Sequence, residues 1–272
     1  MQEEDPNSAL RAKLNAGVEL NLQDASIREV CIALSGVLEA QVFYDTPMIP
    51  FPLGKKVTLR LKPGVRADNA LTDSLSAVGL AWTLYEGALV VSTPEETKTF
   101  VPGAAIGGPS DDVLRKDPDF GFLLFQRVEW TKGQTYKEVL AAMEKLRVPI
   151  QSRYFATFLD EKVEWTAVRT LVGHLRVFAR SHVAQFKISG GEIRFDSDPA
   201  GMGKMFGAVT LRGTVANART AAYTGNVKLY ESLIAVLRKQ KDLAREAVQE
   251  RLEGRDDDKG REILRKMLED LK

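Results

Sequence analysis

The chain has 272 residues, of which 44% are hydrophobic and 28% are charged. This composition is typical of a globular protein and excludes a disordered, collagen-like or membrane-spanning one. The formal net charge of +1 excludes a global field that would attract nucleic acid or anionic lipid. The single cysteine, Cys31, excludes an intramolecular disulfide and a CxxC metal site.

Residues 1–16 read as an N-terminal arm without a targeting signal. They lack a basic and then apolar segment, and no stretch of the chain reaches the roughly 18–20 apolar residues of a membrane-spanning helix. The acidic start with Pro6 is typical of an exported protein just after its cleavage site. We hypothesise that Met1 replaces a removed signal peptide, which a native gene without an upstream signal would contradict.

Residues 17–94 predict a small α+β domain. Val18, Leu20 and Leu22 alternate with polar residues, as in a half-buried strand, and Asp24 is a candidate N-cap for the next helix. Apolar spacing then predicts a helix from Ile27, strands around 42–44 and 57–61, a helix from Ala67, and a hairpin across Glu86-Gly87. The order is strand, helix, strand, strand, helix, strand, strand.

Two segments carry a resemblance to a known family. They read VELNLQDASIREVCIALSGVLEAQVFYD and KKVTLRLKPGVRADNALTDSLSAVGLAWTLYEGALVVS. Together, over about residues 17–93, they resemble the secretin and TonB short N-terminal domain in the order of a strand, a polar turn, a helix ending near a YD strand, a VTL strand and a second helix. The resemblance implies a periplasmic, protein-binding role in the bacterial cell envelope, without catalysis.

The same order is predicted a second time after a linker. Residues 95–120 are rich in Pro and Gly with little periodicity, which indicates a connection between domains. Within residues 121–198 we expect strands at 122–130, 150–158 and 163–165, helices from Tyr136 and Val168, and a hairpin across Gly190-Gly191. The middle of this copy also fits one long hairpin. The predicted fold class is therefore α+β, with two tandem units.

The remainder of the chain is predicted to lack a third such unit. Residues 199–225 are rich in Gly and Ala and read as a linker with one short strand candidate, 209–211. Residues 226–272 carry apolar residues at helical spacing among dense charges, which predicts a helical tail of two helices separated near Gly254. Amphipathic helices of this kind are suited to self-association, and a coiled-coil assembly scaffold is one alternative.

The two histidines predict no catalytic or metal site. His174 and His182 fall in one predicted helix, where eight residues separate them by about 12 Å. That distance is too long for a shared metal or a proton relay. We therefore expect structural roles for both, and no catalytic residue, cofactor or metal ligand is assigned.

Two further segments resemble a phosphate loop and a calcium loop, but their residue spacing does not match either motif. Gly201-Met202-Gly203-Lys204 lacks the four-residue gap and the hydroxyl of a phosphate loop, since Met205 follows the lysine. Asp256-Asp257-Asp258 lacks the alternate ligands of a calcium loop, so we expect it to cap the last helix.

Three arginines form the most basic local cluster in the sequence. Arg169, Arg176 and Arg180 fall on one side of a predicted helix, and we expect that face to be solvated. Aromatic residues for base stacking do not accompany it, so no nucleic-acid partner is predicted.

The sequence thus favours a non-enzymatic module that binds protein partners, without membrane insertion. The expected mode of binding is capture of a partner strand at an open sheet edge. The candidate edge strands are Val18 to Leu22 and Leu89 to Val91. The alternative is a ligand-binding protein or enzyme with a cleft between the two units, using carboxylates such as Asp160 or Glu164. A pocket of convergent polar groups with shifted acidity would favour that alternative.

Overall fold

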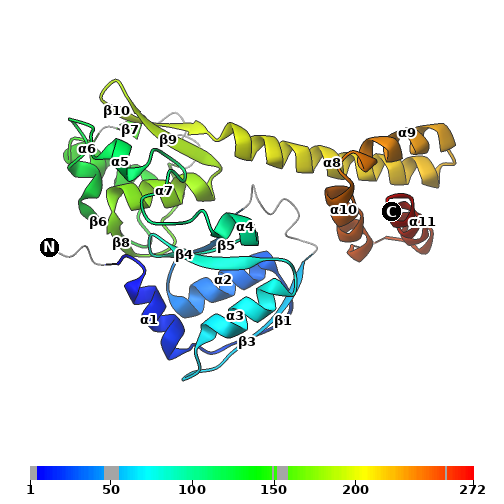
Figure 1. The fold of residues 1–272 in the computed structure, drawn as a ribbon, viewed down its shortest axis with the longest axis horizontal. Helices are drawn as coiled ribbons and strands as arrows, with labels where there is room; N and C mark the ends of the chain where they lie inside the picture. The colour runs from blue at the N-terminus through cyan, green and yellow to red at the C-terminus, as the bar shows by residue number, and fades with distance from the viewer. Residues whose placement is uncertain (1–4, 46–54, 149, 152–158, 255) are drawn as a thin grey trace.

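A computed structural model describes residues 5–45, 55–148, 150–151, 159–254 and 256–272. Two α+β repeats lie side by side, and a long helix leads from the second repeat to a separate group of helices (Figure 1). The predicted α+β class with two tandem units and a C-terminal helical segment is confirmed. None of the helices in these ranges is both long and apolar enough to cross a membrane.

The described residues of the first repeat form seven elements. They are β1 (Leu20–Ser26), α2 (Ile27–Leu38), β2 (Val42–Tyr44), β3 (Lys56–Leu61), α3 (Ala67–Ser76), β4 (Ala81–Tyr85) and β5 (Ala88–Ser92). β1 pairs with β3 in an antiparallel ribbon, and β2, β5 and β4 form a three-stranded sheet in that order. β2 runs parallel to β5, whereas β4 runs antiparallel to it.

The second repeat has the same order and the same pairing. Its elements are β6 (Arg127–Trp130), α6 (Tyr136–Lys145), β7 (Ile150–Gln151), β8 (Ala167–Thr170), α7 (Leu171–Ser181), β9 (Ala184–Ser189) and β10 (Glu192–Ser197). β6 pairs antiparallel with β8, and β7, β10 and β9 form the three-stranded sheet with β7 parallel to β10. The repeat predicted from apolar spacing is therefore a repeat of topology.

The first helix of each repeat begins with the same local signal. Ser26 and Glu29 form a capping box at α2, and Thr135 and Glu138 form one at α6. In each box the hydroxyl accepts from the backbone N–H three residues on, while the glutamate accepts from the cap backbone N–H. The prediction of Asp24 as N-cap is wrong. Asp24 lies within β1 at a bulge, with a left-handed φ of 50°.

The middle strands of the second repeat differ from the prediction. The expected strand at 163–165 is absent from the described residues there, and β8 takes its place at Ala167–Thr170, where the helix had been expected to begin. Thr170 ends the strand and caps α7 by accepting from the N–H of Gly173. The predicted strand at 150–158 lies largely outside the described residues, apart from β7.

The segment between the repeats is packed rather than free. It contains α4 (Pro94–Thr97), α5 (Asp111–Leu114) and a 3-10 turn, η2 (Leu123–Phe125). Gly107 accepts a hydrogen bond from the N–H of Phe186 on β9 at 2.8 Å, and Gly108 lies so close to the Phe186 ring that a Cβ there would overlap it. The predicted linker at 95–120 thus covers part of the β9 edge.

Each repeat has its own apolar core, and a third cluster joins them. The third cluster contains Tyr85, Ala88 and Val90 from the first repeat, Phe100 from the connecting segment and Val177 from α7. The sheet β2-β5-β4 is therefore covered on one face by its own helices and on the other by α7, which explains why all five residues of β5 are buried.

The N-terminal arm contains a helix, α1 (Ser8–Ala16), which packs against α2 and α3. Leu10 and Leu14 are buried in the core of the first repeat. Asn7 accepts a hydrogen bond from the N–H of Gly87, in the β4–β5 turn. Residues 5–16 therefore belong to the packed structure of the first repeat.

The predictions for residues 199–272 are corrected. α8 (Pro199–Tyr223) replaces the expected linker and short strand, and it leads away from the repeats (Figure 1). Three further helices follow it, namely α9 (Val227–Arg238), α10 (Lys241–Glu253) and α11 (Asp258–Asp270), where two were expected. Small apolar residues of α8, such as Ala208, Val215 and Ala218, pack in one core with α9, α10 and α11. Self-association through these helices stays a prediction.

Candidate functional site: a cleft between the repeats

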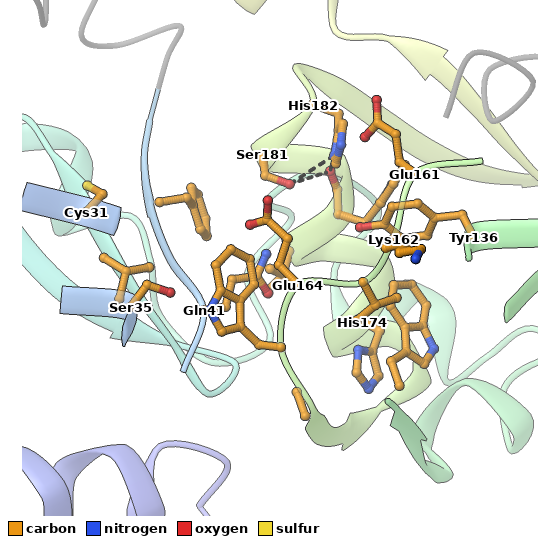
Figure 2. Close-up of a pocket in the computed structure, with 18 of the residues that line it drawn as sticks. Cys31, Ser35, Gln41, Tyr136, Glu161, Lys162, Glu164, His174, Ser181 and His182 are labelled. Atoms are coloured by element: carbon orange, nitrogen blue, oxygen red, sulfur yellow. Dashed lines mark hydrogen bonds between the residues drawn. The ribbon is translucent and has the colours of Figure 1, made fainter. Parts of the chain in front are cut away.

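A cavity of about 490 Å³ opens between the two repeats. Its size lies within the 300–1,000 Å³ range of ligand sites in proteins. Figure 2 shows residues that line it, drawn from both repeats. The first repeat contributes α2 and β2, and the second contributes α7 and the segment 161–167.

β2 presents to this cavity an edge that pairs with no other described strand. It is the outer strand of its sheet, and Gln41 through Tyr44 line the cavity. The N–H groups of Leu89 and Asp45 bond the carbonyls of Gln41 and Val91 respectively. In such a parallel ladder, the backbone groups of Val42 and Tyr44 point away from β5. No described residue pairs with these outward groups.

Two helices form opposite walls of the cavity. α2 contributes Cys31, Ile32 and Ser35, and Ile32 is 63% exposed despite being apolar. α7 contributes Val177 and Phe178 together with both histidines and Ser181. Burial raises the pKa of the Cys31 thiol to about 12, so it stays a protonated thiol at neutral pH.

The segment 161–167 closes the side of the cavity away from β2. Glu161, Lys162, Glu164 and Trp165 line it. In Figure 2 the Glu164 carboxylate points into the space between Gln41 and Ser181, whereas Glu161 lies beside His182. Asp160, one of the two carboxylates considered from the sequence, is exposed and does not line the cavity; Glu164 does.

His174 is buried and packs in the core of the second repeat. Its ring stacks on Trp130 with centroids 4.3 Å apart, and its Nε2 lies 3.1 Å from the carbonyl oxygen of Val128. Burial, followed by the nearby charge of Arg169, lowers the pKa of His174 to about 3. The ring is therefore neutral at physiological pH.

His182 lies at the C-cap of α7 and stacks on Phe178 at 4.2 Å. Its Nδ1 lies 2.9 Å from the carbonyl oxygen of Phe178 and 3.0 Å from Oγ of Ser181. Because a carbonyl only accepts, Nδ1 carries the proton in this arrangement and is not a base for the Ser181 hydroxyl. Burial lowers the pKa of His182 as well.

The shifted pKa of His174 predicts a loss of stability in acid. The unfolded chain takes up a proton near the ordinary histidine pKa of about 6.5, while the folded chain resists it down to about pH 3. Between these values the unfolded state binds more protons, so the free energy of unfolding falls as the pH drops. One histidine contributes up to about 1.4 kcal/mol per pH unit.

Urea unfolding over this pH range, for the parent and for His174→Phe, measures the effect. The phenylalanine keeps an aromatic ring against Trp130 but does not titrate. The free energy of unfolding of the variant should therefore fall less in acid than that of the parent. Equal slopes of unfolding free energy against pH in the two proteins would show that His174 does not contribute.

Three arginines of the second repeat hold the repeats together beside the cleft. The Arg169 guanidinium donates to Oε1 of Gln41 at 2.9 Å and to the Gly87 carbonyl at 3.3 Å. Arg180 donates to the Asp45 carboxylate at 2.8 Å and to Glu96 at 3.3 Å.

Arg176 is the most enclosed of the three. Its side chain is 0% exposed, it forms an ion pair with Asp111 at 2.8 Å, and it donates to the Pro109 carbonyl. Burial also lowers the pKa of Arg169, to about 10, so that it stays charged at neutral pH. The prediction that Arg169, Arg176 and Arg180 form a solvated face is wrong. The face is buried because acidic and carbonyl partners of the first repeat and the connecting segment cover it.

The remaining motifs have structural roles in the residues described. Gly201 through Lys204 lie within α8, so their backbone is helical. Asp257 caps α11 by accepting from the N–H of Gly260, which confirms the predicted acidic cap, and Asp256 pairs with Arg219. Within the described ranges, no group of three or more His, Cys, Asp or Glu residues is placed to hold a metal ion.

The sequence did not predict which strand edge faces the cleft. Leu89 to Val91 form the centre of the sheet in β5, not an edge, because β2 and β4 pair on both sides. Val18 lies before β1, and among the described strands β1 pairs with β3 alone. The edge that opens into the cavity is β2, which was predicted as a strand but not as an edge.

Comparisons of the chain with family models, curated proteins and solved structures find no match. The fold and the cleft define an α+β protein of two tandem repeats with an open strand edge between them. The function is therefore argued from the geometry of this cleft.

Proposed function

We propose that this protein is a non-catalytic interaction module that takes an extended segment of a protein partner into the cleft as an added strand beside β2. The observation that carries the proposal is the edge of β2, which pairs with no described strand and lies inside a cavity walled by two helices. Unpaired strand edges bind extended peptides through their main chain, and flanking pockets receive the alternate side chains.

The buried arginines also support a pre-formed cleft. Arg169, Arg176 and Arg180 fix the second repeat against the first through buried polar contacts, which reduces the ordering cost of binding. Because this basic face is buried, it is not available to nucleic acid, and we propose protein partners only.

A role in the bacterial cell envelope, in the periplasm, is part of the proposal. Its support is the resemblance of residues 17–93 to the secretin and TonB short N-terminal domain. The strand and helix order on which that resemblance depends is present in both repeats. Envelope machinery is the class of partner that this resemblance implies.

Proline at position 44 tests the added strand directly. Tyr44→Pro removes an outward N–H of β2 without removing a bond to β5, because proline is tolerated where the N–H of an edge strand faces solvent. Tyr44→Val is the matched control, since it removes the same ring and keeps the N–H. We expect peptide affinity to fall at least about tenfold from Val to Pro, measured by fluorescence polarisation. Equal affinities would argue against an added strand.

A second candidate is a ligand-binding or enzymatic cleft. The convergence of Tyr136, Glu161 and His182 on one cavity favours it. Burial, and next the charge of Glu161, raise the pKa of Tyr136 to about 12, and burial lowers that of both histidines. These shifts move the pKa values of the three groups further from neutral pH, whereas acid–base catalysis needs pKa values near it.

The geometry thus supports this second candidate as a binding site more than as an active site. A small molecule that raises the melting temperature and displaces peptide from the cleft would favour it over the strand-binding proposal.

A further inference from the structure

We infer that the segment held beside β2 presents basic side chains, lysine or arginine, to the wall formed by the second repeat. The inference rests on the proposed function and specifies the partner that the cleft selects. It depends on which side chains of an added strand would point towards each repeat, and on which charged residues of that repeat they would meet.

An added strand would place alternate side chains against different repeats. Val42 and Tyr44 of β2 pack into the core of the first repeat, where α2 lies, whereas Phe43 packs against the cluster that contains Val177 of α7. A neighbouring strand continues the same pleat. Every second residue would therefore point towards α2, and the residues between would point towards the second repeat.

The wall of the second repeat contains two carboxylates that have no cationic partner among the described residues. Glu161 and Glu164 line the cavity, and neither takes part in an ion pair with another described residue. The Glu164 carboxylate points into the cavity, between Gln41 and Ser181 (Figure 2). A lysine or arginine entering from β2 would supply a charge-assisted hydrogen bond that no described cation gives to these carboxylates.

Aromatic side chains strengthen the preference for a cation. Trp165 and Tyr136 line the same wall. The faces of such rings attract ammonium and guanidinium groups through the electrostatic field of the ring. Carboxylates combined with aromatic faces thus form a site for a basic side chain.

The cations among the described residues that line the cavity form no ion pair with Glu164. Arg28 belongs to α2, on the opposite wall. Lys162 lies beside Tyr136, on the side of the cavity away from Gln41, and its backbone is bridged to Thr135 (Figure 2). Arg169 is already bound to Gln41 and Gly87. Arg28 would disfavour basic residues at the alternate positions that point towards α2, which sharpens the expected pattern.

A displayed library of random decapeptides tests the inference on the full chain. Selected peptides should be enriched in lysine or arginine at alternate positions, and replacing that residue by glutamine in a synthetic peptide should weaken binding about tenfold. With Glu164→Gln the same replacement should weaken binding less than about twofold, which is the expected coupling of a direct pair. Glu144→Gln, an exposed glutamate of α6 outside the cavity, should behave like the parent.

The possible outcomes separate the inference from the proposed function. Peptides that bind the Tyr44→Val protein but not the Tyr44→Pro protein, without any basic preference, would overturn the inference and leave the strand-binding function standing. A basic preference that persists in Glu164→Gln and in Glu161→Gln would also overturn it. If selection yields no peptide sensitive to Tyr44→Pro, the proposed function itself fails.

Discussion

Replacing Arg180 by methionine is expected to lower the free energy of unfolding by about 3–5 kcal/mol. The carboxylate of Asp45 is 0% exposed, and its described partners are Arg180, at 2.8 Å, and the Ser92 hydroxyl. Without the guanidinium the carboxylate stays buried next to a single hydroxyl donor, and a buried charge that loses its partner is costly. Urea unfolding followed by tryptophan fluorescence measures the change.

Two further variants define the cause of this effect. Arg180→Met combined with Asp45→Asn should recover part of the lost stability, because the amide is neutral and still bonds Ser92. Lys187→Met removes an exposed pair with Asp196 on β9 and β10 and should cost less than about 1 kcal/mol. A loss of similar size in Arg180→Met and Lys187→Met would mean that burial of the ion pair does not matter.

Phe178→Ala is expected to cost about 3–5 kcal/mol and to distort the cleft. Phe178 is 2% exposed and contacts the rings of Tyr136, Phe195 and His182, with centroids 4.2–5.5 Å apart. Phe178 also lines the cleft, so its removal leaves a void in the wall of the site, and peptide binding should weaken together with stability. The same unfolding assay and the polarisation assay report the two effects.

Phe206→Ala provides the matched control on α8. Phe206 is 61% exposed, so truncating it should change the free energy of unfolding by less than about 0.5 kcal/mol. Loss of peptide binding in Phe178→Ala with unchanged stability would contradict the packing role of this ring. Loss of stability with unchanged peptide binding would contradict its role in shaping the cleft.

The two repeats share a topology but differ in the surfaces that they bury. α7 is buried on nearly every side because it packs both on its own core and on the sheet of the first repeat, whereas the equivalent α3 keeps an exposed polar face. Likewise β5 is buried at all five positions, while β10 alternates. The sequences of these elements explain the difference, because Ala88 to Val91 of β5 form an apolar run, the pattern of a strand covered on both faces.

Local sequence was enough to predict the order of elements in each repeat. Apolar residues at periods of two and 3.6 placed the strands and helices of the first repeat closely, and the capping signals were present in the chain. Prediction was poorer over 199–225, because each helical glycine costs about 1 kcal/mol relative to alanine and suggests a linker. Packing of Ala208 and Ala218 against α9–α11 outweighs that cost, and this packing joins residues far apart in the sequence.

The candidate site could be predicted in its parts but not as a site. Glu164 and the arginines at 169, 176 and 180 were singled out from the sequence, and β2 was predicted as a strand. Which of them meet depends on how the second repeat docks on the first, through contacts between residues more than 80 positions apart, such as Arg180 with Asp45 and Arg169 with Gly87. Side-chain periodicity reports the neighbours of a residue along its own helix or strand. The partner across an interface is set by the docking of two folded surfaces, so the open edge of β2 and the burial of the basic face emerge only in the folded chain.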